Sequence, residues 1–266
     1  MSYKIAVLGA EGMLGQYVVK RLIKDNLVWT HTREQFDLAY ITGWELGGLL
    51  LKEKFDFVVN CSGIIKQRRD VEPIEMVKVN SVFPLLMADE CARRSIPFIH
   101  ISTDCVYNGK KTSPYIEDDP HDALDTYGKS KSLGEPESAC TIRTSIIGEK
   151  EGDNRSLLGW AKEQKGQQVK GFSNHLWNGL TCWQLAKVIE EIVEKRTFWR
   201  GVRHIHSPDF VSKNVLLGFI NEAYDLDLQI EKVMAEYCNR RLKSKHPITY
   251  NIPKIRDQIF QQRDLK

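Results

Sequence analysis

The sequence predicts an α/β fold in which one parallel sheet is covered by helices on both faces. Short apolar runs, each long enough for one strand, alternate with segments of helical period along the first half of the chain. Residues 5–8 form the first run, and Leu14, Val18 and Leu22 follow at i, i+4 and i+8. Strands joined through helices run parallel, and a parallel sheet buries both its faces.

Later elements continue this alternation. Helices are expected over residues 73–94 and 127–137, where apolar side chains recur with helical period. Thr181 and Gln184 have the spacing of a capping box, which predicts a helix that begins there and runs through Lys195. Further strands are expected at residues 27–30, 57–60, 98–101, 141–143 and 202–205.

The domain organisation follows from these elements. Residues 1–148 are expected to form a nucleotide-binding domain of Rossmann type, to which a return segment at about 180–206 adds a helix and a strand. Residues 149–266 are expected to form a smaller substrate-binding lobe, mainly helical and irregular from about residue 207. No repeat or linker of low complexity separates the two parts.

Composition excludes several classes of protein. A formal net charge of +3 over 266 residues is too small to indicate binding to nucleic acid or to an anionic membrane. No apolar stretch is long enough to span a bilayer, and no signal peptide precedes the first apolar run, so a cytoplasmic protein is expected. The six cysteines are scattered without metal-type spacing, which indicates reduced thiols and no metal site.

A glycine-rich turn follows the first predicted strand directly and opens the first helix. Its spacing, G-x-x-G-x-x-G, lets backbone N–H groups approach a pyrophosphate, whose charge the helix N-terminus favours. This placement indicates a dinucleotide site, with a purely structural tight turn as the alternative. The residues expected to contact the dinucleotide here are Gly9, Glu11, Gly12, Met13, Leu14 and Gly15.

The end of the second predicted strand favours NADP over NAD. An acidic residue there would accept a hydrogen bond from the ribose 2′-hydroxyl, but residues 30–33 read Thr-His-Thr-Arg and offer no carboxylate. Arg33 could instead pair a 2′-phosphate through two hydrogen bonds. NADPH is therefore expected, and Glu34 keeps NADH open.

Tyr127 and Lys131 are the candidate acid/base pair. Four residues apart on a helix, they share one face, and a nearby ammonium lowers the pKa of a phenol, which is ordinarily near 10. Such spacing also arises by chance on exposed helices. Thr103 and Asp104 lie just past the strand at 98–101, at the sheet edge where such folds carry their chemistry, and a hydroxyl there can hydrogen-bond a substrate oxygen.

Together these motifs resemble the extended short-chain dehydrogenase/reductases, and within them the dTDP-4-dehydrorhamnose reductase-like group. The matching segments are G-A-E-G-M-L-G at 9–15, N-C-S-G at 60–63, S-T-D-C-V-Y at 102–107, Y-G-K-S-K at 127–131 and R-T at 143–144. They occur in the family's order over roughly the first 150 residues. The later chain matches only in outline.

The resemblance implies a role for each matched residue. Thr103 would take the family's hydroxyl position, Tyr127 would be the general acid, and Lys131 would tune Tyr127 and hold the nicotinamide ribose. Further cofactor contacts are implied for Asp37 and Leu38 on the adenine side and for Asn60, Cys61 and Ser62 on the nicotinamide side.

Cys105 departs from the family pattern, which commonly has an aromatic residue after S-T-D. Related dehydratases carry a glutamate after the aspartate, and its absence argues against dehydration. A cysteine near this position resembles the bifunctional epimerase/reductases, in which a thiol protonates a carbon beside the ketone. Cys105 is therefore either an epimerase acid or a structural thiol, and we favour the structural thiol.

The segment Asn-His-Leu-Trp-Asn-Gly at 174–179 is the candidate sugar-binding loop. Trp177 would form an apolar wall, and His175 or Asn178 would bond sugar hydroxyls, although a surface turn with a tucked tryptophan is the alternative. A diphosphate would also need cations. The candidates are Arg143, Lys162, Arg240 and Arg241.

The resemblance implies NADPH-dependent reduction of the 4-keto group of a nucleotide-linked 6-deoxyhexose, as in rhamnose biosynthesis. One alternative is a combined 3- or 3,5-epimerase and 4-reductase that uses Cys105. Another is a non-catalytic NADP-binding regulatory subunit, against which the intact set of Thr103, Tyr127 and Lys131 argues. The sequence leaves open the nucleoside (dTDP, UDP or GDP), the sugar's stereochemistry and 2-substituent, and the oligomeric state, with which a homodimer is compatible.

Overall fold

The computed structural model describes residues 2–68, 70–150 and 152–265. Its centre is a parallel sheet of six strands, which confirms the predicted α/β class and the Rossmann-type architecture. The strands lie in the order β2 (Leu27–Thr30), β1 (Lys4–Leu8), β3 (Phe57–Asn60), β4 (Phe98–Thr103), β5 (Cys140–Thr144) and β10 (Gly201–His204).

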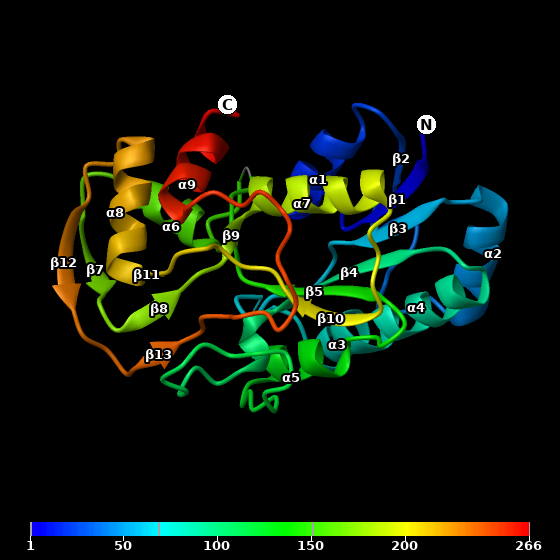
Figure 1. Cartoon of the computed structure of the whole chain (residues 1–266), viewed down its shortest axis with the longest axis horizontal. Helices are drawn as coiled ribbons and strands as arrows, with labels where there is room; N and C mark the ends of the chain where they lie inside the picture. The colour runs from blue at the N-terminus through cyan, green and yellow to red at the C-terminus, as the bar shows by residue number, and fades with distance from the viewer. Residues whose placement is uncertain (1, 69, 151, 266) are drawn as a thin grey trace.

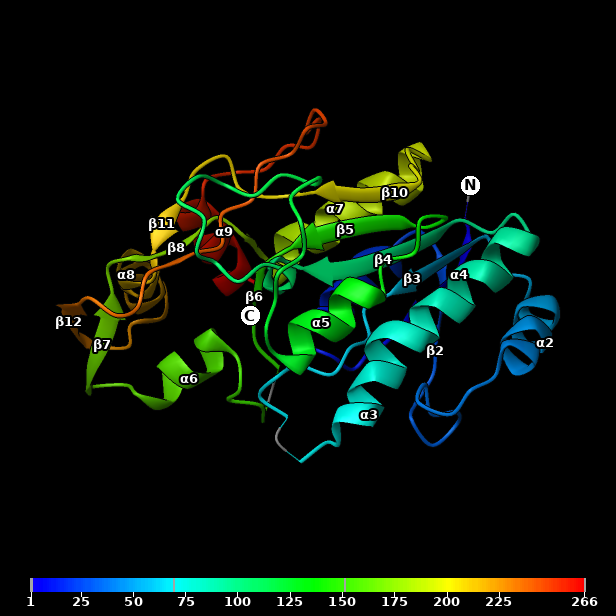
Figure 2. The same cartoon turned by 90° about the horizontal axis from the view of Figure 1, so that it is seen from below.

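Helices cover both faces of this sheet (Figures 1 and 2). On one face α1 (Gly15–Leu22) packs against α7 (Cys182–Lys195). The helix expected at 73–94 is one rod with a π-helical turn at Lys78–Val82. The opposite face carries α2 (Gly43–Glu53), α3 (Pro73–Val77), α4 (Phe83–Arg93) and α5 (Thr126–Leu133).

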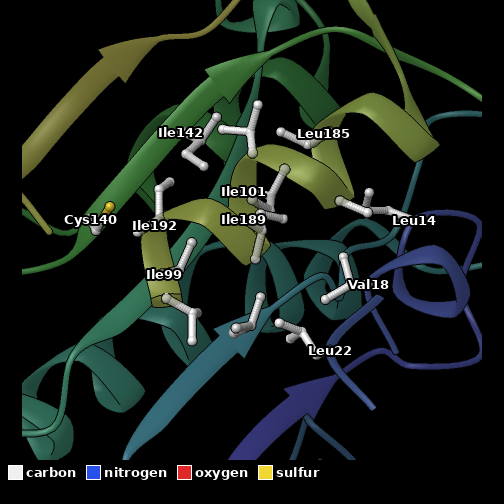
Figure 3. Close-up of a cluster of buried hydrophobic side chains, with 14 of the residues drawn as sticks. Leu14, Val18, Leu22, Ile99, Ile101, Cys140, Ile142, Leu185, Ile189 and Ile192 are labelled. Atoms are coloured by element: carbon white, nitrogen blue, oxygen red, sulfur yellow. The ribbon is translucent and has the colours of Figure 1, made fainter. Parts of the chain in front are cut away.

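Figure 3 shows why α1 and α7 lie together. The inward side chains of both helices interdigitate with apolar side chains of β4 and β5, and each is at most 8% exposed. Burial of this continuous apolar surface is the main force that holds the helices on the sheet. The labelled members are Leu14, Val18, Leu22, Ile99, Ile101, Cys140, Ile142, Leu185, Ile189 and Ile192.

The helices differ from the sequence prediction in one boundary, one cap and one additional element. α5 ends at Leu133 rather than near 137, because the chain at Gly134 passes so close to Asn80 that a Cβ would lie 1.9 Å from its carbonyl oxygen. Thr181 caps α7 as expected, but its backbone N–H donates to Oε1 of Gln258 (3.1 Å) instead of to Gln184, so the reciprocal capping-box bond is not made. α2 was not predicted, although its N-cap at residue 42 forms a full capping box.

The C-terminal lobe has its own apolar core and more strand than the sequence indicated. Its strands are two to five residues long and pair with distant partners, so hydrophobic periodicity does not reveal them. The elements are β6 (Ile146–Ile147), α6 (Leu157–Glu163), β7 (Gln168–Phe172), β8 (His175–Trp177), β9 (Leu180–Thr181), β11 (Val211–Ser212), α8 (Lys213–Tyr224), β12 (Gln229–Val233), β13 (Cys238–Asn239) and α9 (Ile255–Arg263). Within the described ranges, no helix has the length and apolar character needed to cross a membrane.

Candidate active site

The glycine loop joins β1 to α1 and needs its first and third glycines for backbone packing. Gly9 has φ +72°, and a Cβ there would lie 2.7 Å from the backbone of Ser62. A Cβ on Gly15 would lie 2.0 Å from the Gly9 carbonyl oxygen, so α1 starts in direct contact with the loop. At Gly12 a Cβ would meet only that carbonyl oxygen, at 3.0 Å. The open side of Gly12, at a helix N-terminus, fits the approach of a pyrophosphate.

The loop after β3 lies beside the glycine loop, since Cys61 N donates to the Leu8 carbonyl (2.9 Å). Asn60 is buried and holds this loop: its Oδ1 accepts from Ser62 N (3.0 Å), and its Nδ2 lies 3.1 Å from Nδ1 of His100. Burial raises the pKa of the Cys61 thiol to about 12, so it is neutral. The structure thus brings the three predicted residues to the sheet edge, with the Asn60 amide already bonded.

Arg33 lies after β2 with its side chain 60% exposed, and it already has two carboxylate partners. Its Nε donates to Asp37 (2.8 Å) and its Nη2 to Glu75 (2.6 Å), which together raise its pKa. Asp37 was expected to contact adenine, but its carboxylate also accepts from the backbone of Ala39 (2.9 Å). Leu38 packs against the apolar cluster beneath α2 and α4. A 2′-phosphate at Arg33 would have to share the guanidinium with both carboxylates.

Thr103 and Tyr127 meet because α5 packs closely on the end of β4. A Cβ on Gly128 would lie 2.3 Å from the carbonyl oxygen of Cys105, so no larger residue fits there. The Thr103 hydroxyl accepts from Cys105 N (3.1 Å), lies 3.2 Å from a carboxylate oxygen of Asp104, and acts to lower the pKa of the Tyr127 phenol. Two segments 24 residues apart in the sequence therefore form one polar group.

Lys131 lies on the same helix and is 4% exposed. Its Nζ donates to the carbonyl of Ile101 on β4 (2.7 Å). Burial lowers the pKa of Lys131 to about 8, while Glu135 and, to a lesser extent, Cys61 act in the opposite direction. The ammonium is therefore close to its titration midpoint near neutral pH.

Tyr127 departs from one expectation. Burial raises the pKa of its phenol, Cys105 and Asp104 raise it further, and the hydrogen bond from Thr103 only partly opposes them. Lys131 was expected to lower this pKa, but its ammonium is held at the Ile101 carbonyl. The phenol is protonated at neutral pH, which suits a proton donor.

Cys105 lines a cavity of about 360 Å³ between the end of β4 and the C-terminal lobe. Burial raises the pKa of its thiol to about 12, and neighbouring Asp104 raises it too. Burial also raises the pKa of Asp104, which Arg240 partly opposes. His175, whose Nε2 lies 2.8 Å from the Glu236 carbonyl, lines the same cavity.

Arg143 is not available to a substrate, which corrects the sequence expectation. Its side chain is 2% exposed and pairs with both carboxylate oxygens of Glu135, at 2.9 and 2.5 Å. Its Nη1 donates to the Tyr107 hydroxyl (2.6 Å) and approaches Nε2 of His204 (2.9 Å). Arg143 is thus part of the framework beneath the site.

Trp177 and Asn178 also have internal partners, so two of the three residues expected to bind the sugar are structural. The Trp177 indole lies in the lobe core and donates to the hydroxyl of Ser145 (2.8 Å). The Asn178 amide makes two bonds with the backbone of Leu242, at 2.8 and 2.9 Å. Of these three, His175 alone lines the cavity.

Sequence reasoning missed most of the cavity wall, because the loop before β13 carries no periodic signal. Lys110, Asp125, Tyr237 and Arg240 contribute to it, and of these only Arg240 was a candidate. A larger cavity of about 680 Å³ lies beside α1 and α9. Thr103, Tyr127 and Lys131 are in the lining of neither cavity, but Cys105, two residues after Thr103, lines the smaller one. Among the residues that the structure describes, no group of three or more His, Cys, Asp or Glu side chains could hold a metal ion.

Comparison with known proteins decides the family. The profile described as "RmlD substrate binding domain" matches residues 3–240. The chain belongs to this family. This confirms the resemblance to the dTDP-4-dehydrorhamnose reductase-like group and extends it well beyond the segments that carried it in the sequence.

Two curated relatives and one solved structure illustrate the RmlD-family membership. A "dTDP-4-dehydrorhamnose reductase" of Burkholderia thailandensis is 32% identical over 77% of this chain and 72% of that protein. "Spore coat polysaccharide biosynthesis protein SpsK" of Bacillus subtilis is 28% identical over 89% of this chain and 85% of that protein. A dTDP-4-dehydrorhamnose reductase from Bacillus anthracis, crystallised with NADP, has a TM-score of 0.83 at 14% identity, covers 98% of both chains and shares the fold.

This RmlD-family chain is therefore an oxidoreductase of the extended short-chain dehydrogenase/reductase type. Thr103 ends β4, and Tyr127 and Lys131 lie on α5, which packs against the end of that strand.

Proposed function

We propose that the chain reduces the 4-keto group of a nucleotide-linked 6-deoxyhexose with NADPH. The observation that carries this proposal is the close packing of α5, which holds Tyr127 and Lys131 one helical turn apart, on the end of β4 beside Thr103. Cys105, two residues after Thr103, lines a cavity of about 360 Å³. The reductase names of the relatives support the reaction class. The complete set of three groups also disfavours a purely regulatory subunit.

The cofactor would lie across the glycine loop, with its adenosine end towards Arg33 and its nicotinamide end towards Lys131. Bound NADPH would supply the hydride for the ketone carbon. The neighbouring loop of Asn60, Cys61 and Ser62 would line the nicotinamide side, and the neutral thiol of Cys61 brings no charge there. NADP bound to a structural neighbour supports the choice of cofactor.

The chain's own groups would handle the proton. The Thr103 hydroxyl hydrogen-bonds the ketone oxygen and holds it near Tyr127. As that oxygen gains negative charge, the protonated phenol donates its proton, and the raised pKa of Tyr127 keeps it protonated until then. The Lys131 ammonium, which is held at the Ile101 carbonyl, would bind the nicotinamide ribose, and the phenolate that remains on Tyr127 takes a proton back from solvent.

The sugar would occupy the cavity beside Cys105, with Arg240 as the cation on its wall. Arg240 is the best-placed of the four candidate cations. Arg143 is paired with Glu135, Lys162 with Glu149, and Arg241 with Asn239 and the Thr112 carbonyl. We accordingly assign substrate binding to residues 149–266, apart from the return segment at 180–206. The cytoplasmic location and a homodimer stay predictions.

The direct test is incubation of the protein with NADPH and a panel of dTDP- and UDP-linked 4-keto-6-deoxy sugars. Loss of the reduced-nicotinamide absorbance with one nucleotide series is expected, together with a 4-hydroxy product. If no member of the panel is reduced while NADPH binds, the sugar assignment is wrong.

Replacement of Arg33 by alanine should narrow the preference for NADPH over NADH about tenfold, because a charge-assisted contact to the 2′-phosphate is lost. Dissociation constants of both cofactors, measured by nicotinamide fluorescence, give the ratio. Arg93→Ala removes an exposed arginine on α4 that likewise pairs with two carboxylates, and it should leave the ratio unchanged. Equal dissociation constants in the unmutated protein would refute the role of Arg33.

Epimerase activity is the second candidate, because Cys105 and His175 line one cavity. It would exchange a proton at carbon 3 or 5 with solvent. We expect no deuterium there after turnover in deuterated water, since the neutral thiol of Cys105 cannot itself abstract the proton and Nε2 of His175 already lies 2.8 Å from the Glu236 carbonyl. Mass spectrometry of the product checks this. Label that disappears in Cys105→Ser, while a sugar of product configuration is still reduced, would instead establish the epimerase.

A further inference from the structure

We propose that Glu135 is a positioning residue that locks the catalytic helix α5 against the end of β4 and supports the positive charge on Lys131. The second part rests on the role proposed above for Lys131. Glu135 stands four residues after Lys131, just beyond the end of α5 at Leu133. It belongs to none of the surfaces assigned above to cofactor or sugar.

The carboxylate of Glu135 joins three segments of the chain. Its side chain is 5% exposed, and one oxygen accepts hydrogen bonds from the hydroxyl of Ser102 and from Nε of Arg143 (2.9 Å). The other oxygen accepts from Nη2 of Arg143 (2.5 Å). Ser102 directly precedes Thr103 on β4, so this one carboxylate ties the catalytic hydroxyl's strand to the end of the catalytic helix and to β5.

The groups behind Arg143 are neutral. Its guanidinium also meets the Tyr107 hydroxyl, Nε2 of His204 (2.9 Å) and Nε2 of His121 (2.7 Å). Burial lowers the pKa of His204 to about 4 and lowers the pKa of His121 as well. Both rings are therefore neutral, so they can accept hydrogen bonds from the Arg143 guanidinium and do not repel it. Among the described residues, Glu135 is the acidic residue that forms an ion pair with Arg143.

Among the groups near Lys131, Glu135 is the one whose charge stabilises the protonated form of the lysine. From β4 come the carbonyl of Ile101, which accepts from Nζ, and the buried ring of His100, whose pKa is lowered so that it is neutral. From the loop after β3 comes Cys61, a neutral thiol. Glu135 and Cys61 act to retain the proton on Lys131, and since Cys61 is a neutral thiol, the carboxylate of Glu135 is the main source of this effect.

Loss of the Glu135 charge should therefore favour the uncharged amine. Lys131 has a lowered pKa of about 8, so the buried ammonium stays charged at neutral pH by a small margin. Removing an opposing negative charge shifts the equilibrium further towards the neutral form. Loss of a hydrogen bond to Glu135 without loss of its charge should not change the Lys131 pKa. This difference distinguishes electrostatic stabilisation of Lys131 from a purely structural role of Glu135.

The test is an NMR titration of lysine ¹³Cε in the cofactor-free protein, with the Lys131 signal assigned by its loss in Lys131→Arg. In Glu135→Gln the midpoint is expected to fall by about one pH unit, a tenfold change in the protonated fraction. Ser102→Ala removes a hydrogen bond to Glu135 and keeps the carboxylate, so its Lys131 midpoint should differ from the wild-type value by only a small fraction of one pH unit. An unchanged midpoint in Glu135→Gln would overturn the proposal.

Two further variants guard against loss of fold. Glu135→Gln leaves the buried Arg143 cation unpaired, which destabilises the fold, so Glu135→Gln/Arg143→Met removes both charges and should also show a lowered midpoint. Glu135→Asp keeps the charge and should restore the midpoint towards the wild-type value. Because the titration uses neither NADPH nor sugar, failure to bind NADPH would contradict the proposed function and leave this test intact.

Discussion

Tyr127→Phe should lower turnover on a verified 4-keto sugar at least a hundredfold and leave the NADPH dissociation constant nearly unchanged. The variant deletes the proton donor, and general acid catalysis contributes about 10²–10⁴-fold, while little binding surface is lost. Steady-state kinetics with a parallel fluorescence titration of NADPH measures both quantities. Lys131→Ala, by contrast, should impair both.

Retention of more than about a tenth of wild-type turnover by Tyr127→Phe would show that another group donates the proton, given the size of a general-acid contribution. Tyr107→Phe is a matched control. That phenol also has a raised pKa, but its hydroxyl hydrogen-bonds the Ile116 carbonyl and Arg143, and the variant keeps the ring that lines the cavity. Its loss should lower the free energy of unfolding more than it lowers catalysis.

Gly15→Ala should weaken NADPH binding about tenfold. The added Cβ would stand 2.0 Å from the Gly9 carbonyl oxygen and 2.7 Å from Cα of Ala10, both of them backbone atoms. The loop must open or α1 must move away from β1, and overpacking of this kind costs about 1–3 kcal/mol, where each 1.4 kcal/mol is roughly tenfold in affinity. NADPH fluorescence titration and thermal unfolding measure the two effects.

Gly48→Ala is the control for that substitution. Gly48 lies within α2, and beyond the helix's own backbone no atom of the described residues lies within 4 Å of the Cβ that alanine would add. Alanine also favours the helix, so stability should rise by about 0.4–1 kcal/mol with no change in NADPH affinity. Equal NADPH affinity in Gly15→Ala and the wild type would mean that the loop geometry does not hold the cofactor.

Features that depend on local sequence were predictable. The strand, glycine loop and helix at residues 5–22 follow from apolar spacing and from three glycines, and the shared face of Tyr127 and Lys131 follows from helical geometry. α2 also had a local signal that was overlooked, since Thr42 and Glu45 form a capping box before an apolar run.

Features that depend on distant partners were not predictable. Arg143 looked like a cation for a diphosphate, but Glu135, Tyr107 and His204 enclose it. Arg33 was assigned to a phosphate, although Glu75, 42 residues away, already shares its guanidinium. An arginine can either stabilise the framework or bind a ligand, and its tertiary contacts decide which. The spacing of residues in a single sequence does not reveal those contacts.

The central claim, hydride transfer to carbon 4 of a nucleotide-linked sugar with a proton from Tyr127, is tested most directly with NADPH deuterated at the transferable position of the nicotinamide. Mass spectrometry and NMR of the product should find one deuterium at carbon 4 and none at carbons 3 and 5, with the Tyr127→Phe variant making little product. NADPH oxidation without deuterium at carbon 4, or deuterium elsewhere on the ring, would contradict the account.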